Sequence, residues 1–134
     1  MLDFAQAHHV NLIFFLKVNY DQDPQIYRNF NRNASERGIR VHLLDGDPSW
    51  VEPQSAAEIT RMTGWLLEYN RASRPAERFF SGLHVDIEPY NTPNWNSADQ
   101  RGIITKWENT VDFLIKEARK TENVEIGADL PFFG

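Results

Sequence analysis

The 134-residue sequence contains no cysteine, and this absence excludes several kinds of chemistry at once. Without thiols the chain cannot form a disulfide framework, a thiolate-ligated zinc or iron–sulfur centre, or a cysteine nucleophile. Basic residues are not in excess either, because 14 lysines and arginines stand against 19 aspartates and glutamates. The resulting net charge of −5 gives no electrostatic reason to bind nucleic acid or an anionic membrane.

Long apolar segments and phosphate-binding loops are missing as well. The longest uninterrupted apolar run covers residues 12–16, which is far too short to cross a bilayer. Met1 is not followed by the basic and then apolar residues of a signal peptide. No GxGxxG or Walker loop follows an expected strand, which excludes the commonest nucleotide-binding α/β proteins. The sequence therefore indicates a soluble chain without a visible targeting segment.

What the sequence does contain is an alternation of short apolar runs and amphipathic segments. We expect strands over residues 10–20, 39–45, 80–89 and 124–130. Helices are expected to begin at Asp23, Ser55 and Ser97, after the tail of a helix over residues 2–9. This order predicts one α/β domain over residues 1–134, with parallel strands joined by right-handed crossovers. A doubly wound sheet and a (β/α)₈ barrel both fit, but a barrel needs about 250 residues, so the chain would hold only half of one.

The third expected strand carries the clearest chemical signal. Its residues 83, 85 and 87 are apolar, and the residues that follow each of them are His84, Asp86 and Glu88. In a strand the apolar residues would pack under the helices and the other three would share the opposite face. Two neighbouring carboxyls push their pKa values apart, as a general acid beside an ionised partner requires. The alternative is an edge strand with a solvated polar face, but crossovers on both sides place this strand inside the sheet.

Other polar and aromatic residues follow the expected strands and are weaker candidates for a substrate-binding pocket. They are Lys17, Asn19, Asp45, Asp47, Trp50, Tyr90, Trp95 and Asp129. Active sites of α/β folds gather at the carboxyl ends of parallel strands, which is where these residues lie. Each acidic residue alone is more typical of a turn or a helix cap. The two loop tryptophans could stack on a sugar ring or simply anchor their loops.

Residues 80–90, FSGLHVDIEPY, resemble the fourth strand of (β/α)₈ glycoside hydrolases, most nearly the chitinase-like family 18 group. That family's strand ends in Asp-x-x-Asp-x-Asp-x-Glu, and the matching residues here are Ser81, His84, Asp86 and Glu88. The resemblance implies that Glu88 donates a proton to the leaving glycosidic oxygen. It also implies that Asp86 orients an N-acetyl group that acts as the nucleophile. Glu88 followed by Pro89 also resembles the Asn-Glu-Pro of the large retaining-glycosidase clan, where this glutamate is again the acid/base.

The resemblance also carries expectations for the whole protein. If Glu88 ends strand four, the chain holds about strands two to five of a partial (β/α)₈ barrel and is a piece of a larger barrel domain. The function implied is hydrolysis of O-glycosidic bonds in an oligosaccharide or polysaccharide, without a cofactor. Relatives of such barrels are commonly secreted, so the parent protein is expected outside the cell or in its envelope.

Two other functions remain open on the sequence. A metal-dependent hydrolase, for example a phosphodiesterase, could bind a divalent cation through His84, Asp86 and Glu88, completed by Asp45 or Asp129. A non-catalytic chain could bind carbohydrate without cleaving it, or be a truncated remnant of a barrel. Half a barrel would also leave two strand edges exposed, which are a template for pairing with a second copy.

Overall fold

The computed structural model describes residues 1–77, 82–96, 98–120 and 124–130. Within these residues four strands form one sheet in the order β1-β2-β3-β4, and every neighbouring pair is parallel. The strands are β1 (Leu12–Leu16), β2 (Arg40–Asp45), β3 (Gly82–Val85) and β4 (Glu125–Ala128). The helices are α1 (Leu2–Ala7), α2 (Pro24–Glu36), α3 (Ala56–Ala72) and α4 (Gln100–Ala118). The predicted α/β class, with parallel strands alternating with helices, is therefore confirmed.

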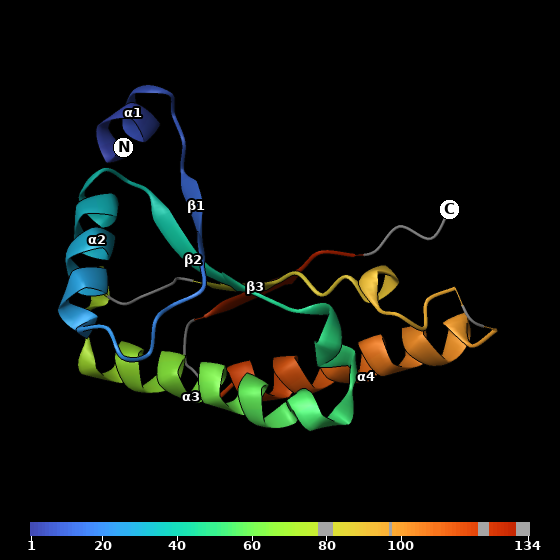
Figure 1. The fold of residues 1–134 in the computed structure, drawn as a ribbon. Helices are drawn as coiled ribbons and strands as arrows, with labels where there is room; N and C mark the ends of the chain where they lie inside the picture. The colour runs from blue at the N-terminus through green and yellow to red at the C-terminus, as the bar shows by residue number, and fades with distance from the viewer. Residues whose placement is uncertain (78–81, 97, 121–123, 131–134) are drawn as a thin grey trace.

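Helices α2, α3 and α4 all lie on one side of the sheet (Figure 1). Each strand pairs with the next one along the chain, so every crossover returns the chain on the same side. The opposite face of the sheet has no helix from the described residues over it (Figure 1). This layering is compatible with part of a (β/α)₈ barrel, whose helices form only an outer ring. No helix among the described residues is long and apolar enough to cross a membrane.

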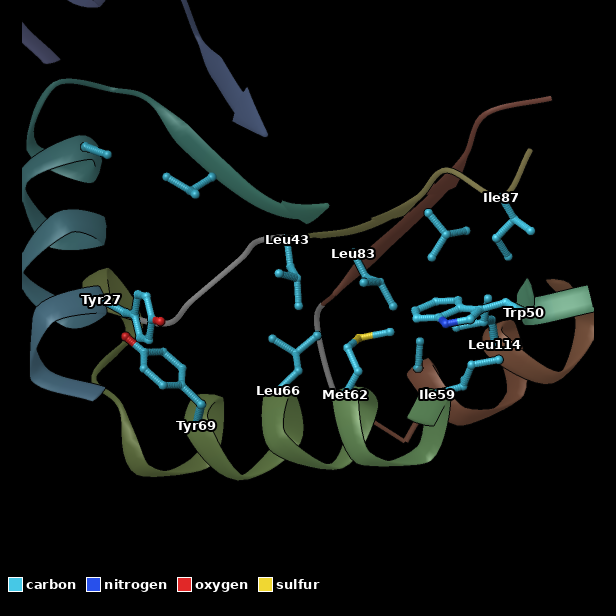
Figure 2. Close-up of a cluster of buried hydrophobic side chains, with 14 of the residues drawn as sticks. Tyr27, Leu43, Trp50, Ile59, Met62, Leu66, Tyr69, Leu83, Ile87 and Leu114 are labelled. Atoms are coloured by element: carbon cyan, nitrogen blue, oxygen red, sulfur yellow. The ribbon is translucent and has the colours of Figure 1, made fainter. Parts of the chain in front are cut away.

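The hydrophobic core lies between the sheet and these three helices. Leu43 of β2 and Leu83 of β3 are fully buried and point toward Met62 and Leu66 of α3 (Figure 2). Burial of four such side chains contributes about 1.5–3 kcal/mol each relative to leaving them exposed. Val85 continues the buried series of β3 beside Leu83. The predicted alternation of the third strand, with its apolar residues under the helices, is confirmed.

The starts of the helices follow the sequence signals in part. Asp23 caps α2 as predicted, because its Oδ1 accepts a hydrogen bond of 2.9 Å from the Gln25 N–H. The predicted capping box at Ser55 is wrong: its hydroxyl donates to the Ser49 carbonyl at 2.8 Å, since a 3₁₀ turn precedes α3. Ser97, predicted to open the last helix, lies outside the described residues. Asp99 caps α4 in the structure.

Three strands end earlier than predicted at their carboxyl ends, while the second ends at Asp45 as predicted. The first ends at Leu16 because Lys17 has a φ of 52°, which takes the chain out of extended geometry. The second ends at Asp45 because Gly46, with a φ of 154°, turns the chain. In the third, residues 80 and 81 lie outside the described residues, and the strand pairs from Gly82 to Val85. The backbone conformation at these strand ends determines the direction of the polar side chains that follow the strands.

Candidate functional site

The carboxyl ends of the four strands are held side by side by backbone hydrogen bonds that continue past the ladders. Lys17 N donates to the Leu44 carbonyl at 2.9 Å, and Asp86 N donates to the Asp45 carbonyl at 3.0 Å. Asp129 N donates to the Val85 carbonyl at 2.9 Å. The backbone positions that carry most of the predicted polar side chains therefore lie in one row, along the carboxyl ends of the strands. Their side chains nevertheless separate into two groups on opposite faces.

The first group is the acidic group of β3 and β4, which lies on the face away from the helices. His84, Asp86 and Glu88 are half-buried on this face, while the residues between them are buried under the helices. The prediction that this strand is internal is confirmed, because β3 pairs with both β2 and β4. His84 Nε2 lies 2.9 Å from Asp129 Oδ1 of the neighbouring strand. The geometry thus brings two predicted residues together from different strands.

Asp86 sits at the centre of this acidic group. Burial raises the pKa of Asp86, and the negative charges of Glu88 and Asp129 raise it further, against the smaller opposing effect of His84. Like charges around one carboxyl favour its neutral form, which can donate a hydrogen bond. The group therefore contains one carboxyl that holds its proton to higher pH than an isolated aspartate.

Glu88 is fixed in position by two neighbours in the turn that follows β3. The Tyr90 hydroxyl donates to Glu88 Oε1, and Asn91 Nδ2 donates to Oε2 at 2.8 Å. The bond to Glu88 raises the pKa of Tyr90 to about 12, so Tyr90 stays neutral and can act as the donor. Two donors leave lone pairs on both oxygens of a carboxylate. Glu88 is thus oriented and still able to contact a ligand.

Asn91 was not among the residues predicted from the sequence. Its position reflects the short 3₁₀ turn Pro89–Asn91, which returns the amide toward Glu88. The sequence signal that could have found Asn91 is Pro89. Proline favours the first position of such a turn, and the turn brings the side chain of Asn91, three residues after Glu88, close to the Glu88 carboxylate.

The second group lies on the helix side of the sheet. Asp45 continues the series of β2 residues that face the helices and is buried, which raises its pKa. Its carboxylate accepts from the Gly46 N–H at 2.8 Å and lies 3.8 Å from Lys17 Nζ. The expectation that Asp45 joins the β3 acids at one pocket is wrong, because period-two alternation places it on the opposite face.

Three further candidates have structural roles in the loops. Asp47 accepts from the Ser49 N–H at 2.8 Å and caps the 3₁₀ turn Pro48–Val51. Asn19 accepts from the Asp21 N–H at 3.0 Å within its own turn. Trp50 is only 1% exposed and packs in the core near Ile87 (Figure 2), so of the two alternatives it anchors its loop and does not stack on a sugar. Trp95 lies half-buried in the segment between β3 and α4.

The face away from the helices also holds residues that the sequence reasoning passed over. Glu125 Oε2 of β4 lies 3.1 Å from Arg40 Nη1 and 3.3 Å from His42 Nε2, both of β2. These side chains meet across β3 because Gly82 stands between them, and a Cβ there would collide with the His42 ring. A glycine within a strand signals such a close approach. Burial lowers the pKa of His42.

A hollow of about 480 Å³ lies on this face, beside the acidic group. Its lining residues are Leu12, Phe14, His42, His84, Glu125, Ile126 and Gly127. A ligand held at the carboxyl edge could extend into this hollow past His84, which belongs to both. Among the described residues, no three His, Asp or Glu side chains are grouped so that they could hold a metal ion.

Replacing Asp86 by asparagine is expected to stabilise the protein at neutral pH. The folded protein holds this proton more tightly than the unfolded chain, whose carboxyl titrates near 3.8. The resulting stabilisation is complete below that pH and is lost as pH rises through the folded-state pKa. Above it, the ionised carboxyl is repelled by its acidic neighbours. Thermal unfolding across a pH series should show a higher Tm for Asp86→Asn at neutral pH and a smaller difference in acid.

Asp47→Asn is the matched control for this experiment, with the opposite expected sign. Hydrogen bonds from Ser49 lower the pKa of Asp47, so its ionised form stabilises the fold at neutral pH and this contribution is lost as pH falls through the folded-state pKa. The asparagine variant should therefore be less stable than the native protein at neutral pH. A destabilised Asp86→Asn variant at neutral pH would contradict the repulsion described above.

The chain was compared with protein-family models, with curated proteins and with solved structures, and none of the three comparisons gave a significant match.

Proposed function

We propose that the acidic group at the carboxyl end of β3 hydrolyses O-glycosidic bonds, with Glu88 as general acid and Asp86 as its stabilising partner. The observation that carries the proposal is that both carboxyls directly follow one internal strand and face away from the helices, with Glu88 held by Tyr90 and Asn91. Holding two half-buried acids close together at the end of an internal strand costs free energy unless the protein uses them. Hydrolysis of a glycosidic bond is a use that requires two carboxyls close together.

The proposed reaction begins with protonated Glu88 beside the glycosidic oxygen. Proton transfer to that oxygen accompanies cleavage of its bond to the anomeric carbon, and positive charge develops on the sugar ring. Asp86, next on the same face, stabilises this charge directly or by orienting a neighbouring group of the substrate. Water then adds to the anomeric carbon and returns a proton to Glu88. Tyr90 and Asn91 keep the Glu88 carboxyl in place through both proton transfers.

The arrangement of the sheet supports the partial-barrel part of the proposal. Four parallel strands in sequential order, with α2, α3 and α4 on one side, are what consecutive units of a (β/α)₈ barrel would give (Figure 1). Glu88 then lies at the carboxyl end of a barrel strand, where catalytic residues of such barrels are found. The sequence resemblance of residues 80–90 to strand four of chitinase-like glycosidases fits this position. An oligosaccharide that contains N-acetylated sugars is the substrate class we propose.

The test is hydrolysis of a panel of aryl glycosides, including aryl N-acetylhexosaminides, by the purified chain. We expect release of the aryl alcohol, fastest with the N-acetylated substrates. An aryl phosphodiester assayed with added Mg²⁺ or Mn²⁺ serves as the comparison substrate. Cleavage of that diester without cleavage of any glycoside would contradict the proposal and favour the metal-dependent hydrolase. Absence of glycoside hydrolysis from acidic to neutral pH would contradict it as well.

A further inference from the structure

Glu88 lies on a short stretch of backbone between two regular elements. Strand β3 ends at Val85, and the 3₁₀ turn begins at Pro89. The φ of Glu88 is −95° and its ψ is 83°, which is neither helical nor the geometry of an extended strand. The peptide unit that joins Ile87 to Glu88 therefore lies between the regular hydrogen bonds of the strand and those of the turn.

A tryptophan of α4 is hydrogen-bonded to this peptide unit. The indole N–H of Trp107 donates to the carbonyl oxygen of Ile87, and the two atoms are 3.0 Å apart. Ile87 is only 2% exposed, so its carbonyl has little access to water. A buried carbonyl that lacks a donor costs free energy. In the described part of the chain, the indole of Trp107 thus satisfies a backbone group next to Glu88.

The helix that carries Trp107 is anchored on both sides of this residue. Lys106 Nζ lies 3.2 Å from Glu52 Oε2, and the Thr110 hydroxyl donates to the Trp50 carbonyl at 2.8 Å. Both contacts join α4 to the segment that follows β2. Trp107 therefore donates its hydrogen bond from a helix whose position is fixed by contacts other than the one to Ile87.

We infer that Trp107 is a positioning residue for Glu88. Because a peptide unit is planar, the direction of the Ile87 carbonyl also fixes the nitrogen and the Cα of Glu88. These atoms set the direction in which the Glu88 side chain leaves the backbone, and Tyr90 and Asn91 then hold its carboxylate. The effect on catalysis rests on the proposed hydrolysis, whereas the effect on the conformation of Glu88 does not.

The first test measures the backbone conformation of Glu88 by NMR in the purified chain. The scalar coupling between its amide and α protons reports φ, which is −95° in the native structure. In Trp107→Phe the Ile87 carbonyl loses its donor and the peptide unit is free to rotate, so this coupling should change. Trp107→His should restore it, because Nε2 of histidine can donate from the same place in a five-membered ring as the indole nitrogen.

Trp65→Phe is the matched control for the loss of an indole ring. Trp65 is also half-buried on a helix, where its ring stacks on Tyr69, and this variant should keep the native coupling of Glu88. Circular dichroism verifies that each variant is folded. If Trp107→Phe does not fold, benzothienylalanine at position 107 removes the N–H alone, since sulfur replaces nitrogen in a ring system of nearly the same shape.

The second test uses the proposed reaction. Trp107→Phe should lower kcat on phenyl glycosides by about 10–100-fold with KM unchanged, because a misplacement of about 1 Å can cost about 100-fold in rate. The loss should be much smaller on dinitrophenyl glycosides, whose leaving group needs no proton. Trp65→Phe should keep the native kcat on both substrates.

The positioning role and the proposed hydrolysis can fail separately. A chain that cleaves no glycoside contradicts the hydrolysis, and the coupling of Glu88 then still decides the role of Trp107. An unchanged φ of Glu88 in Trp107→Phe would overturn the positioning role, whatever the activity. So would a native kcat in that variant, an equal loss of kcat in Trp65→Phe, or a Trp107→His variant that behaves like Trp107→Phe.

Discussion

Glu88→Gln is expected to reduce hydrolysis of glycosides with poor leaving groups by about 10²–10⁴-fold, the contribution of a general acid. Glutamine has the shape of glutamate and can still accept the Tyr90 hydroxyl, but it has no proton to transfer at ordinary pH. The fold should be unaffected, because the side chain is half-buried at the end of a strand and not in the core. Initial rates with phenyl glycosides, together with thermal unfolding, measure both effects.

The leaving group separates loss of the acid from a general disturbance of the site. Dinitrophenolate leaves as a stable anion and needs no proton from the enzyme. Glu88→Gln should therefore lose far less activity on a dinitrophenyl glycoside than on a phenyl glycoside. Equal losses on both substrates would indicate that Glu88 has another role. Glu108→Gln is the matched control, since Glu108 is exposed on α4, and its activity should equal that of the native chain. Native-like turnover of phenyl glycosides by Glu88→Gln would remove Glu88 from the mechanism.

Gly46→Ala is expected to destabilise the fold by about 3 kcal/mol or more. The glycine has a φ of 154°, which a residue with a side chain rarely adopts. A Cβ at this position would also collide with the backbone carbonyl of Asp86, which cannot rotate away as a side chain would. Overpacking costs about 1–3 kcal/mol, and an unfavourable backbone conformation adds a similar amount. Chemical denaturation followed by tryptophan fluorescence measures the free energy of unfolding.

Gly64→Ala provides the control with the opposite sign. Gly64 lies within α3, and an added Cβ would meet no heavy atom within 4 Å outside its own helix. Alanine is the better helix former, so the variant should be more stable by about 0.5–1 kcal/mol. If Gly46→Ala proved as stable as the native chain, the close approach of Gly46 to the Asp86 backbone would not contribute to the stability of the fold. Gly46→Ala protein that still folds should also have a lower rate of the proposed hydrolysis, because the clash displaces the Asp86 backbone.

Much of the fold follows from local sequence patterns, namely apolar periodicity and capping residues, and the sequence therefore predicts it. The order of strands and helices follows from apolar periodicity, and the Asp23 cap of α2 follows from one carboxylate next to a proline. The internal position of β3 follows from crossovers on both of its sides. The predicted sharing of one face by His84, Asp86 and Glu88 follows from the period of two in an extended chain.

The tertiary structure alone decided which of the strand-end residues meet. Positive φ angles at Lys17 and Gly46 end the regular alternation, so the side chains beyond them could not be assigned to a face in advance. Lys17 therefore reaches Asp45 on the helix side, the face that the alternation of β2 already gives Asp45, and Asp129 meets His84 on the other face. Trp50, read as a loop residue, is buried because its 3₁₀ turn folds back against α4. Periodicity fixes the direction of a side chain only as long as the backbone repeats, and contacts between distant segments are set where that repetition stops.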